Sequence, residues 1–163
     1  DFLIDIFHEV YKTNNNSVLL LVGKGELENI IKDKVDKLNL NHCVIFLGLR
    51  VDVNRLYQAM DVFLLPSFHE GLGVVLIESQ ASGLKNYVSD TITLEANVSN
   101  NIKYISLKES SKYWADCIIG CDKNNSRTDM VKNLISAGFS VETEASKLEI
   151  IYEKLNKENG IFK

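Results

Sequence analysis

The apolar positions of the chain follow two patterns that alternate along the sequence. The first stretch has the three- and four-residue spacing of an amphipathic helix: Phe2, Leu3, Ile6, Phe7 and Val10. Continuous apolar runs bounded by turn residues come next, at 18–22, 43–47 and 61–65. Because a run that is apolar at every position has no polar face, these segments predict strands covered on both sides, as in a parallel sheet.

Helical patterns separate the predicted strands. Helices are expected at 26–38, 52–60, 73–82, 112–119, 124–138 and 142–157, and further strands at 86–89 and 103–107. Ser110 or Ser111 is suited to cap the helix over 112–119, and Gly83 is suited to follow a helix end. Strands that alternate with helices at this spacing predict an α/β fold, a Rossmann-like doubly wound parallel sheet with helices on both faces.

Ligands of such sheets bind beyond the carboxyl ends of the strands. The loops expected there are 23–26, 48–52, 66–73 and 89–94. In loop 66–73, Gly71, Leu72 and Gly73 lead directly into a helix. Their free N–H groups and the positive end of the helix dipole form an anion site, which is suited to a phosphate group.

Two glutamates flank this anion site. Glu78 lies in the same helix, about 8 Å from its start at 1.5 Å per residue. That is about the distance from a nucleotide's diphosphate to its ribose. A carboxylate can accept hydrogen bonds from both ribose hydroxyls. The neighbouring residues 74–77 are all apolar, so a carboxylate there is costly without a donor partner. Glu70, in the loop, would face the hydroxyls of a transferred sugar.

Composition narrows the class of protein. The 163 residues suit one domain, predicted over 1–163, and 45% hydrophobic with 25% charged residues excludes disorder. A net charge of −4 without a basic stripe speaks against nucleic-acid binding. No apolar run reaches the roughly 18 residues of a membrane span. Three cysteines without close metal-ligand spacing indicate a reducing compartment, no disulfide framework and no metal site.

Five motifs in order resemble one enzyme family. The spacing Glu70-x7-Glu78 resembles the E-x7-E signature of retaining family-4 glycosyltransferases. The family's V-G-x-G-x-L turn, V-x-F-L-G strand, A-D-V-F-x-x-P-S run and G-x-P-V-x-x-S-D stretch resemble segments 20–27, 44–48, 59–67 and 83–90. Position 73 is often Pro or Phe in the family and is Gly here, and Lys85 stands where its proline is expected. The resemblance extends more loosely to the exopolysaccharide and capsular polysaccharide subgroup.

The resemblance implies the C-terminal, donor-binding half of a GT-B enzyme that transfers a sugar from a nucleoside-diphosphate donor with retention. Glu70 is then the catalytic residue at the donor sugar, and Glu78 binds the ribose. The remaining donor-binding residues implied are Gly71, Leu72, Gly73, Gly23, Lys24, Gly48, Leu49, Arg50 and His69. No metal and no cofactor are implied beside the substrate, a UDP-sugar or another NDP-sugar.

Three of these residues have plain structural alternatives. Arg50 sits where it could contact the base or a phosphate, and the rival is a surface ion pair with Asp52. His69 is placed to hydrogen-bond a donor sugar, and the rival is a structural role in the loop. Lys24 is as well explained by an exposed turn as by a phosphate contact.

The chain opens on a helix without a leading loop, which suggests a piece of a longer protein. The family's first strand of this domain, the Arg and Lys after it, and the acceptor-binding domain have no match. We therefore expect weak donor binding and no sugar transfer by the chain alone. A gap, a rearranged pairing or a swapped neighbour could each take the place of that strand. The acceptor domain is the implied partner, and a cytoplasmic location with peripheral association at the inner face of the membrane is implied by lipid-linked acceptors.

Two other functions stay open at this stage. In a non-catalytic nucleotide-binding Rossmann module, loss of the Glu78 carboxylate would change nothing in the function. A nucleotide-sugar epimerase of the same GT-B fold would differ in the region that has no match here. A dinucleotide dehydrogenase is disfavoured, because no G-x-G-x-x-G motif is present.

Overall fold

The computed structural model describes residues 1–120 and 130–159. Strands and helices alternate as the sequence predicts, and most boundaries fall within one or two residues of the expected ones. The elements are α1 (Phe2–Thr13), β1 (Leu19–Val22), α2 (Glu28–Lys37), β2 (Val44–Gly48), α3 (Val53–Ala59), β3 (Val62–Leu65), α4 (Val74–Ala81), β4 (Lys85–Ser89), the 3₁₀ turn η1 (Leu94–Ala96), β5 (Ile102–Ile105), α5 (Ser111–Ile119), α6 (Val131–Ser136) and α7 (Val141–Asn159). The first part of the helix predicted over 124–138 lies outside the described residues.

The strands form two parallel sheets. Strand β1 pairs with β2, and β4 pairs with β3 on one side and β5 on the other. Within the described residues, β1 and β3 have no ladder between them. The sheet is therefore interrupted between β1 and β3 in the described part of this single chain. The parallel direction of every pair and the helices on both faces confirm the predicted fold class.

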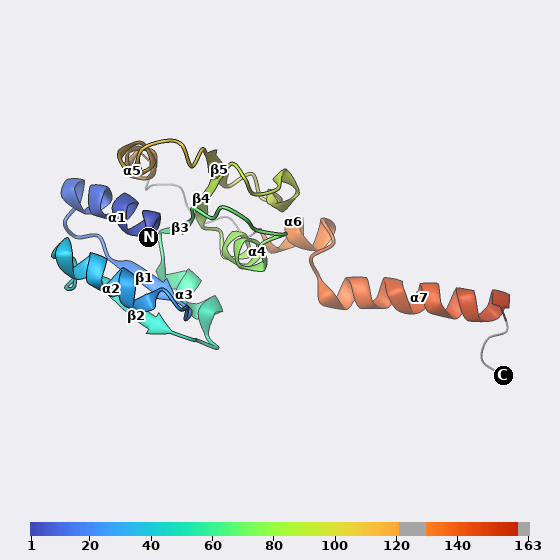
Figure 1. Ribbon diagram of the computed structural model, residues 1–163. Helices are drawn as coiled ribbons and strands as arrows, with labels where there is room; N and C mark the ends of the chain where they lie inside the picture. The colour runs from blue at the N-terminus through green and yellow to red at the C-terminus, as the bar shows by residue number, and fades with distance from the viewer. Residues whose placement is uncertain (121–129, 160–163) are drawn as a thin grey trace.

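Helix α1 packs on both sheets. Its Ile4 and Phe7 belong to a core cluster formed with α2, β1 and β2. Its Ile6 belongs to a second cluster with β4, β5 and Trp114 of α5. Figure 1 shows α1 between α2 and α5. Burial of these apolar side chains by one helix joins the two sheets into one body.

Helices α3 and α4 cover the other side of the β3–β4–β5 sheet. Leu76 of α4 is fully buried in a third cluster with Val88 of β4 and with Ile92 and Ala96 of the following loop. Helix α3 contacts α4. Gly83 ends α4 with φ +69°, and Ser110 caps α5 by accepting a hydrogen bond from the Tyr113 amide, as the sequence predicts for both.

Helix α7 extends away from the rest of the molecule (Figure 1). Large apolar side chains of this helix are exposed, among them Leu148, Ile151, Tyr152 and Leu155. None of its described side chains is buried. The helix is therefore held to the molecule mainly through its first turn and the preceding α6.

Candidate functional site

The loop after β3 leads into α4 through a glycine in the left-handed region. Gly73 has φ +65° and precedes the first residue of the helix, Val74. The first hydrogen bonds to the Gly73 carbonyl come from Leu76, at 2.8 Å, and Ile77, at 3.4 Å. The amides of Val74 and Val75 therefore precede the helical ladder, directly after the segment 71–73 for which the sequence predicts an anion site.

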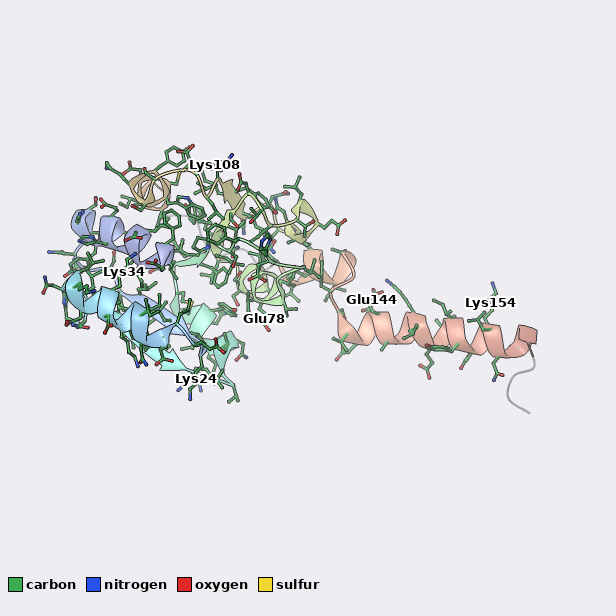
Figure 2. All side chains as sticks on the ribbon, viewed as in Figure 1. Lys24, Lys34, Glu78, Lys108, Glu144 and Lys154 are labelled. Atoms are coloured by element: carbon green, nitrogen blue, oxygen red, sulfur yellow. The ribbon has the colours of Figure 1, made fainter. Side chains whose placement is uncertain are left out.

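Both predicted glutamates have exposed side chains beside this helix start. The expectation that the helix around Glu78 is buried is wrong in part, because Val74 is 66% exposed whereas Leu76 is fully buried. Helix α4 thus has one buried and one exposed side. Glu78 is exposed and is labelled in Figure 2. Its carboxylate is therefore not buried away from water.

A tyrosine supplies the donor partner that the sequence argument requires for Glu78. The Tyr57 hydroxyl, on α3, lies 3.3 Å from Glu78 Oε2 and 3.3 Å from the Val75 carbonyl oxygen. Burial, and secondarily the Glu78 carboxylate, raise the pKa of Tyr57 to about 12. The hydroxyl therefore keeps its proton at neutral pH and acts as a hydrogen-bond donor.

Hydroxyl groups fix the loop that carries Glu70. Ser67 Oγ donates to Glu70 Oε1 at 3.1 Å. The Ser67 carbonyl accepts hydrogen bonds from Ser89 Oγ and, at 2.8 Å, from Thr91 Oγ1. These bonds join the carboxyl ends of β3 and β4, so the loop starts from a fixed point.

The loops after β1 and β2 meet at two glycines. Gly23 donates its N–H to the Gly48 carbonyl at 2.8 Å, and both have positive φ, +123° and +63°. A Cβ added at Gly48 would lie 3.8 Å from Lys24 Cε, so the Lys24 side chain passes over this glycine. The structure thus brings together three residues that the resemblance assigns to the donor site.

Arg50 forms the ion pair that was its structural alternative. Its Nε and Nη2 donate to the two carboxylate oxygens of Asp52 at 2.8 and 2.7 Å, and this lowers the pKa of the Asp52 carboxyl. Asp52 stands at the N-cap of α3 as predicted, but its side chain makes no cap hydrogen bond because it binds Arg50. Leu49 beside it is 75% exposed, and His69 is also exposed, in the loop of Glu70.

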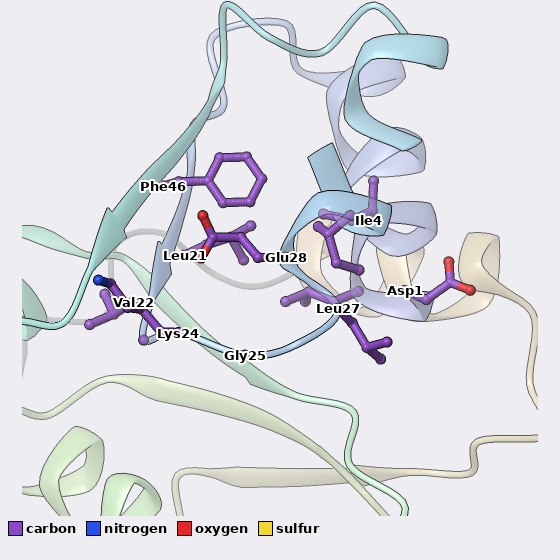
Figure 3. A pocket seen from close by; sticks show the side chains of 12 residues that line it. Asp1, Ile4, Leu21, Val22, Lys24, Gly25, Leu27, Glu28 and Phe46 are labelled. Carbon is purple, nitrogen blue, oxygen red and sulfur yellow. The ribbon is translucent and has the colours of Figure 1, made fainter. Parts of the chain in front are cut away.

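A pocket of about 310 Å³ opens beside the Lys24 loop (Figure 3). It lies between the start of α1, the end of β1 and the start of α2, and most of its lining is apolar. Gly23 and Lys24 line it, whereas Glu70 and Glu78 do not. Gly48, Leu49 and Arg50 do not line it either, so Gly23 and Lys24 are the only predicted donor-site residues in this pocket.

Sequence reasoning missed Tyr57, Ser67 and Thr91 as partners of the site. Ser67 was visible only as part of a motif, Thr91 follows the last motif segment, and Tyr57 was visible only as an aromatic residue in a short helix. Over the described residues, no three His, Cys, Asp or Glu side chains are placed to hold a metal ion, and no helix there is long and apolar enough to span a membrane.

Two solved structures that share this fold contain UDP or a UDP-sugar. The chain superimposes on HepE from Anabaena in complex with UDP-glucose with a TM-score of 0.72 at 21% identity, covering 94% of this chain and 44% of that one. Pneumococcal GtfA, an O-GlcNAc transferase in complex with UDP and GlcNAc, gives a TM-score of 0.73 at 19% identity over 94% and 32% of the two chains. At these identities the likeness shows the fold.

Sequence relatives are more informative. Bacillus subtilis (strain 168) EpsF, named as a glycosyltransferase, is 30% identical over 93% of this chain and 40% of its own length. The Escherichia coli UDP-Gal:alpha-D-GlcNAc-diphosphoundecaprenol alpha-1,3-galactosyltransferase is also 30% identical, over 84% of this chain and 37% of its own. The chain thus spans about 40% of the length of these relatives. The family model for glycosyl transferases group 1 matches residues 1–121, and the chain therefore belongs to this family.

Proposed function

We propose that this chain is the nucleotide-sugar donor-binding domain of a retaining glycosyltransferase, which moves a sugar from an NDP-sugar to a polysaccharide or lipid-linked acceptor. The observation that carries the proposal is the position of the two exposed glutamates along the chain, Glu70 in the loop before the α4 amino terminus and Glu78 within α4. Main-chain N–H groups and a positive dipole end lie between two acceptor carboxylates, which matches a diphosphate between a ribose and a sugar.

Each residue then has a distinct task. The amides of Gly71, Leu72 and Gly73 hold the diphosphate and stabilise the negative charge that grows on it as the sugar leaves. Glu78 accepts the ribose hydroxyls, and Glu70 accepts a hydroxyl of the donor sugar. The fixed start of the Glu70 loop keeps that carboxylate in place while the glycosidic bond breaks.

The loops after β1 and β2 complete the donor site in this proposal. Gly48 and Leu49 border the base, and the exposed Leu49 side chain offers an apolar surface to its ring. Lys24, above Gly48, is a cation beside the phosphates, with Gly23 below it. Arg50 reaches a phosphate or the base only by leaving Asp52. His69 serves as a further donor to the sugar hydroxyls.

The acceptor and the location are inferred from the relatives. Their names include a diphosphoundecaprenol acceptor and Vi polysaccharide biosynthesis, which supports assembly of an exopolysaccharide or capsule on a lipid carrier. We propose that the full protein works in the cytoplasm against the inner face of the membrane, without a bound metal. Donor binding by this chain is then weak, and transfer needs an acceptor-binding domain.

Calorimetric titration of UDP tests the donor site. Glu78→Ala removes a charge-assisted hydrogen bond, and we expect it to weaken UDP binding by about 1.5–3 kcal/mol, or roughly 10- to 150-fold. Glu153→Ala, at an exposed glutamate of α7, is the matched control and should leave the affinity unchanged. Repeating the titration with GDP identifies the base, and repeating it with EDTA tests for a metal.

Equal UDP affinity of wild type and Glu78→Ala would remove the ribose assignment and favour a non-catalytic nucleotide-binding module. A large loss of affinity in EDTA would replace the metal-free site with a metal-dependent one. Full-rate sugar transfer by the 163-residue chain would overturn the assignment of this chain as a donor half.

A further inference from the structure

Tyr57 is held in one orientation by the packing of its ring. Its side chain belongs to the buried face of α3, with only 3% of the residue exposed. The ring meets Phe63 of β3 edge-on, with centroids 5.9 Å apart and an interplanar angle of 73°. A buried aromatic ring in such a contact has few rotamers available, so the position of its hydroxyl is fixed by the fold.

The hydroxyl has one proton, and the acceptors 3.3 Å from it include Glu78 Oε2 and the Val75 carbonyl. The carboxylate is the stronger acceptor because it is charged. The Val75 carbonyl already has an acceptor role within α4, where the helical pattern pairs it with the amide four residues on. Glu78 Oε2 is therefore the preferred partner of Tyr57.

An exposed glutamate without such a partner samples several rotamers, and ordering it on ligand binding costs free energy. The Tyr57 hydrogen bond holds Oε2, while Glu78 as a whole is exposed. It also connects two loops of the donor site, since α3 follows loop 48–52 and Glu78 belongs to the helix after loop 66–73. The carboxylate is thus oriented before any ligand arrives.

We propose that Tyr57 is a positioning residue, whose hydroxyl holds the Glu78 carboxylate in the orientation that accepts the ribose hydroxyls of a nucleoside diphosphate. This inference rests on the proposed function and extends it to a residue that does not touch the ligand. Tyr57 then affects binding only by orienting Glu78 toward the ribose hydroxyls. Its effect is therefore absent when the Glu78 carboxylate or the ribose hydroxyls are removed.

The test is a calorimetric comparison of UDP with 2′,3′-dideoxy-UDP, which lacks both ribose hydroxyls. We expect Tyr57→Phe to weaken UDP binding about 3- to 10-fold, the range for one hydrogen bond, and to leave dideoxy-UDP binding unchanged. In the Glu78→Ala background, Tyr57→Phe should change the UDP affinity less than about twofold. A purely structural role of Tyr57 would weaken both ligands alike.

A second variant does not depend on the stability of Tyr57→Phe. Glu78→Asp keeps the charge and withdraws the carboxylate from Tyr57 by one methylene group, so it should lose UDP affinity and keep dideoxy-UDP affinity. If Glu78→Ala weakens UDP binding while Tyr57→Phe does not, the positioning role is wrong and the donor site stands. If wild type and Glu78→Ala bind UDP equally, the ribose assignment and this inference fall together.

Discussion

At the scale of single residues, Gln80 is the most heavily bonded polar side chain described. Its Nε2 donates to the carbonyls of Leu76 and Ala96 at 3.1 and 2.7 Å. Its Oε1 accepts from the amides of Val98 and Ser99 and from the Ser99 hydroxyl at 2.9–3.1 Å. The side chain is fully buried, so it fastens the loop between β4 and β5 onto α4.

Replacing Gln80 with leucine keeps the volume and removes every one of these bonds. Buried donors left without partners cost about 1–3 kcal/mol each, so we expect Gln80→Leu to lower the free energy of unfolding by about 3 kcal/mol or more. Urea denaturation measures this. Glu153→Leu, a similar change on an exposed face of α7, should stay within about 0.5 kcal/mol of wild type. A loss below about 1 kcal/mol in Gln80→Leu would show that the network does not persist in solution.

The phenol of Tyr57 gives a prediction for alkaline pH. Its pKa in the folded chain is about 12 against an ordinary value of 10.0, so the unfolded chain releases this proton first. The free energy of unfolding must therefore fall as the pH rises from about 10 to about 12. Burial also raises the pKa of Tyr104 and of the Cys43 thiol, so part of the decline belongs to them.

Tyr57→Phe isolates the contribution of this residue. The variant should lose stability less steeply than wild type over the same alkaline range, as measured by urea denaturation at several pH values. Parallel curves for the two proteins would mean that the Tyr57 phenol ionises equally in both states and is not buried against Glu78.

At the scale of elements, α6 and α7 differ in how they are held. Leu134 of α6 is 5% exposed, and α6 contacts α4. Helix α7 buries none of its described side chains and points away from the molecule (Figure 1). Since most helical stability in proteins comes from packing of an apolar face, α7 contributes little to the stability of the rest.

Truncation after Ser140 tests this difference. We expect the helical circular-dichroism signal to fall while the free energy of unfolding stays within about 0.5 kcal/mol of the intact chain. Leu134→Ala in α6 is the comparison and should cost about 2 kcal/mol or more. A truncation that destabilises the chain as much as Leu134→Ala would place α7 against the folded body.

At the scale of the whole molecule, the two sheets predict uneven protection of the backbone. Strand β4 is paired on both sides, whereas β1, β3 and β5 are each paired on one side within the described residues. Amide hydrogens at 85–89 should therefore exchange more slowly with deuterium than those at 19–22 and 62–65. Mass spectrometry of peptic peptides measures this, with 102–105 as the edge-strand control. Equal protection of β1 and β4 would require a further strand beside β1.

Much of this architecture is predictable from sequence because local pattern dictates it. The continuous apolar runs gave the strands, and Gly83 and Ser110 marked helix ends that depend on short-range hydrogen bonds. The turn η1 was missed, since three residues carry no periodicity. Exposure of Val74 also escaped prediction, because which side of a helix is covered depends on its neighbours in space.

The site was predicted in the same uneven way. Arg50 and Asp52 are two residues apart, so their pairing was foreseen as an alternative. Tyr57 and Glu78 are 21 residues apart, and their contact depends on how α3 packs against α4. The motif places the two glutamates, whereas the tertiary structure supplies the side chain that orients one of them.

The sharing of α1 between the two sheets has a mechanical consequence. Loops 23–26 and 48–52 follow strands of one sheet, and loops 66–73 and 89–94 follow strands of the other. A nucleotide that contacts both groups of loops would connect the two sheets, as α1 does. In the proposed donor site such a ligand would add a second connection between the two sheets, on the side of the strand ends.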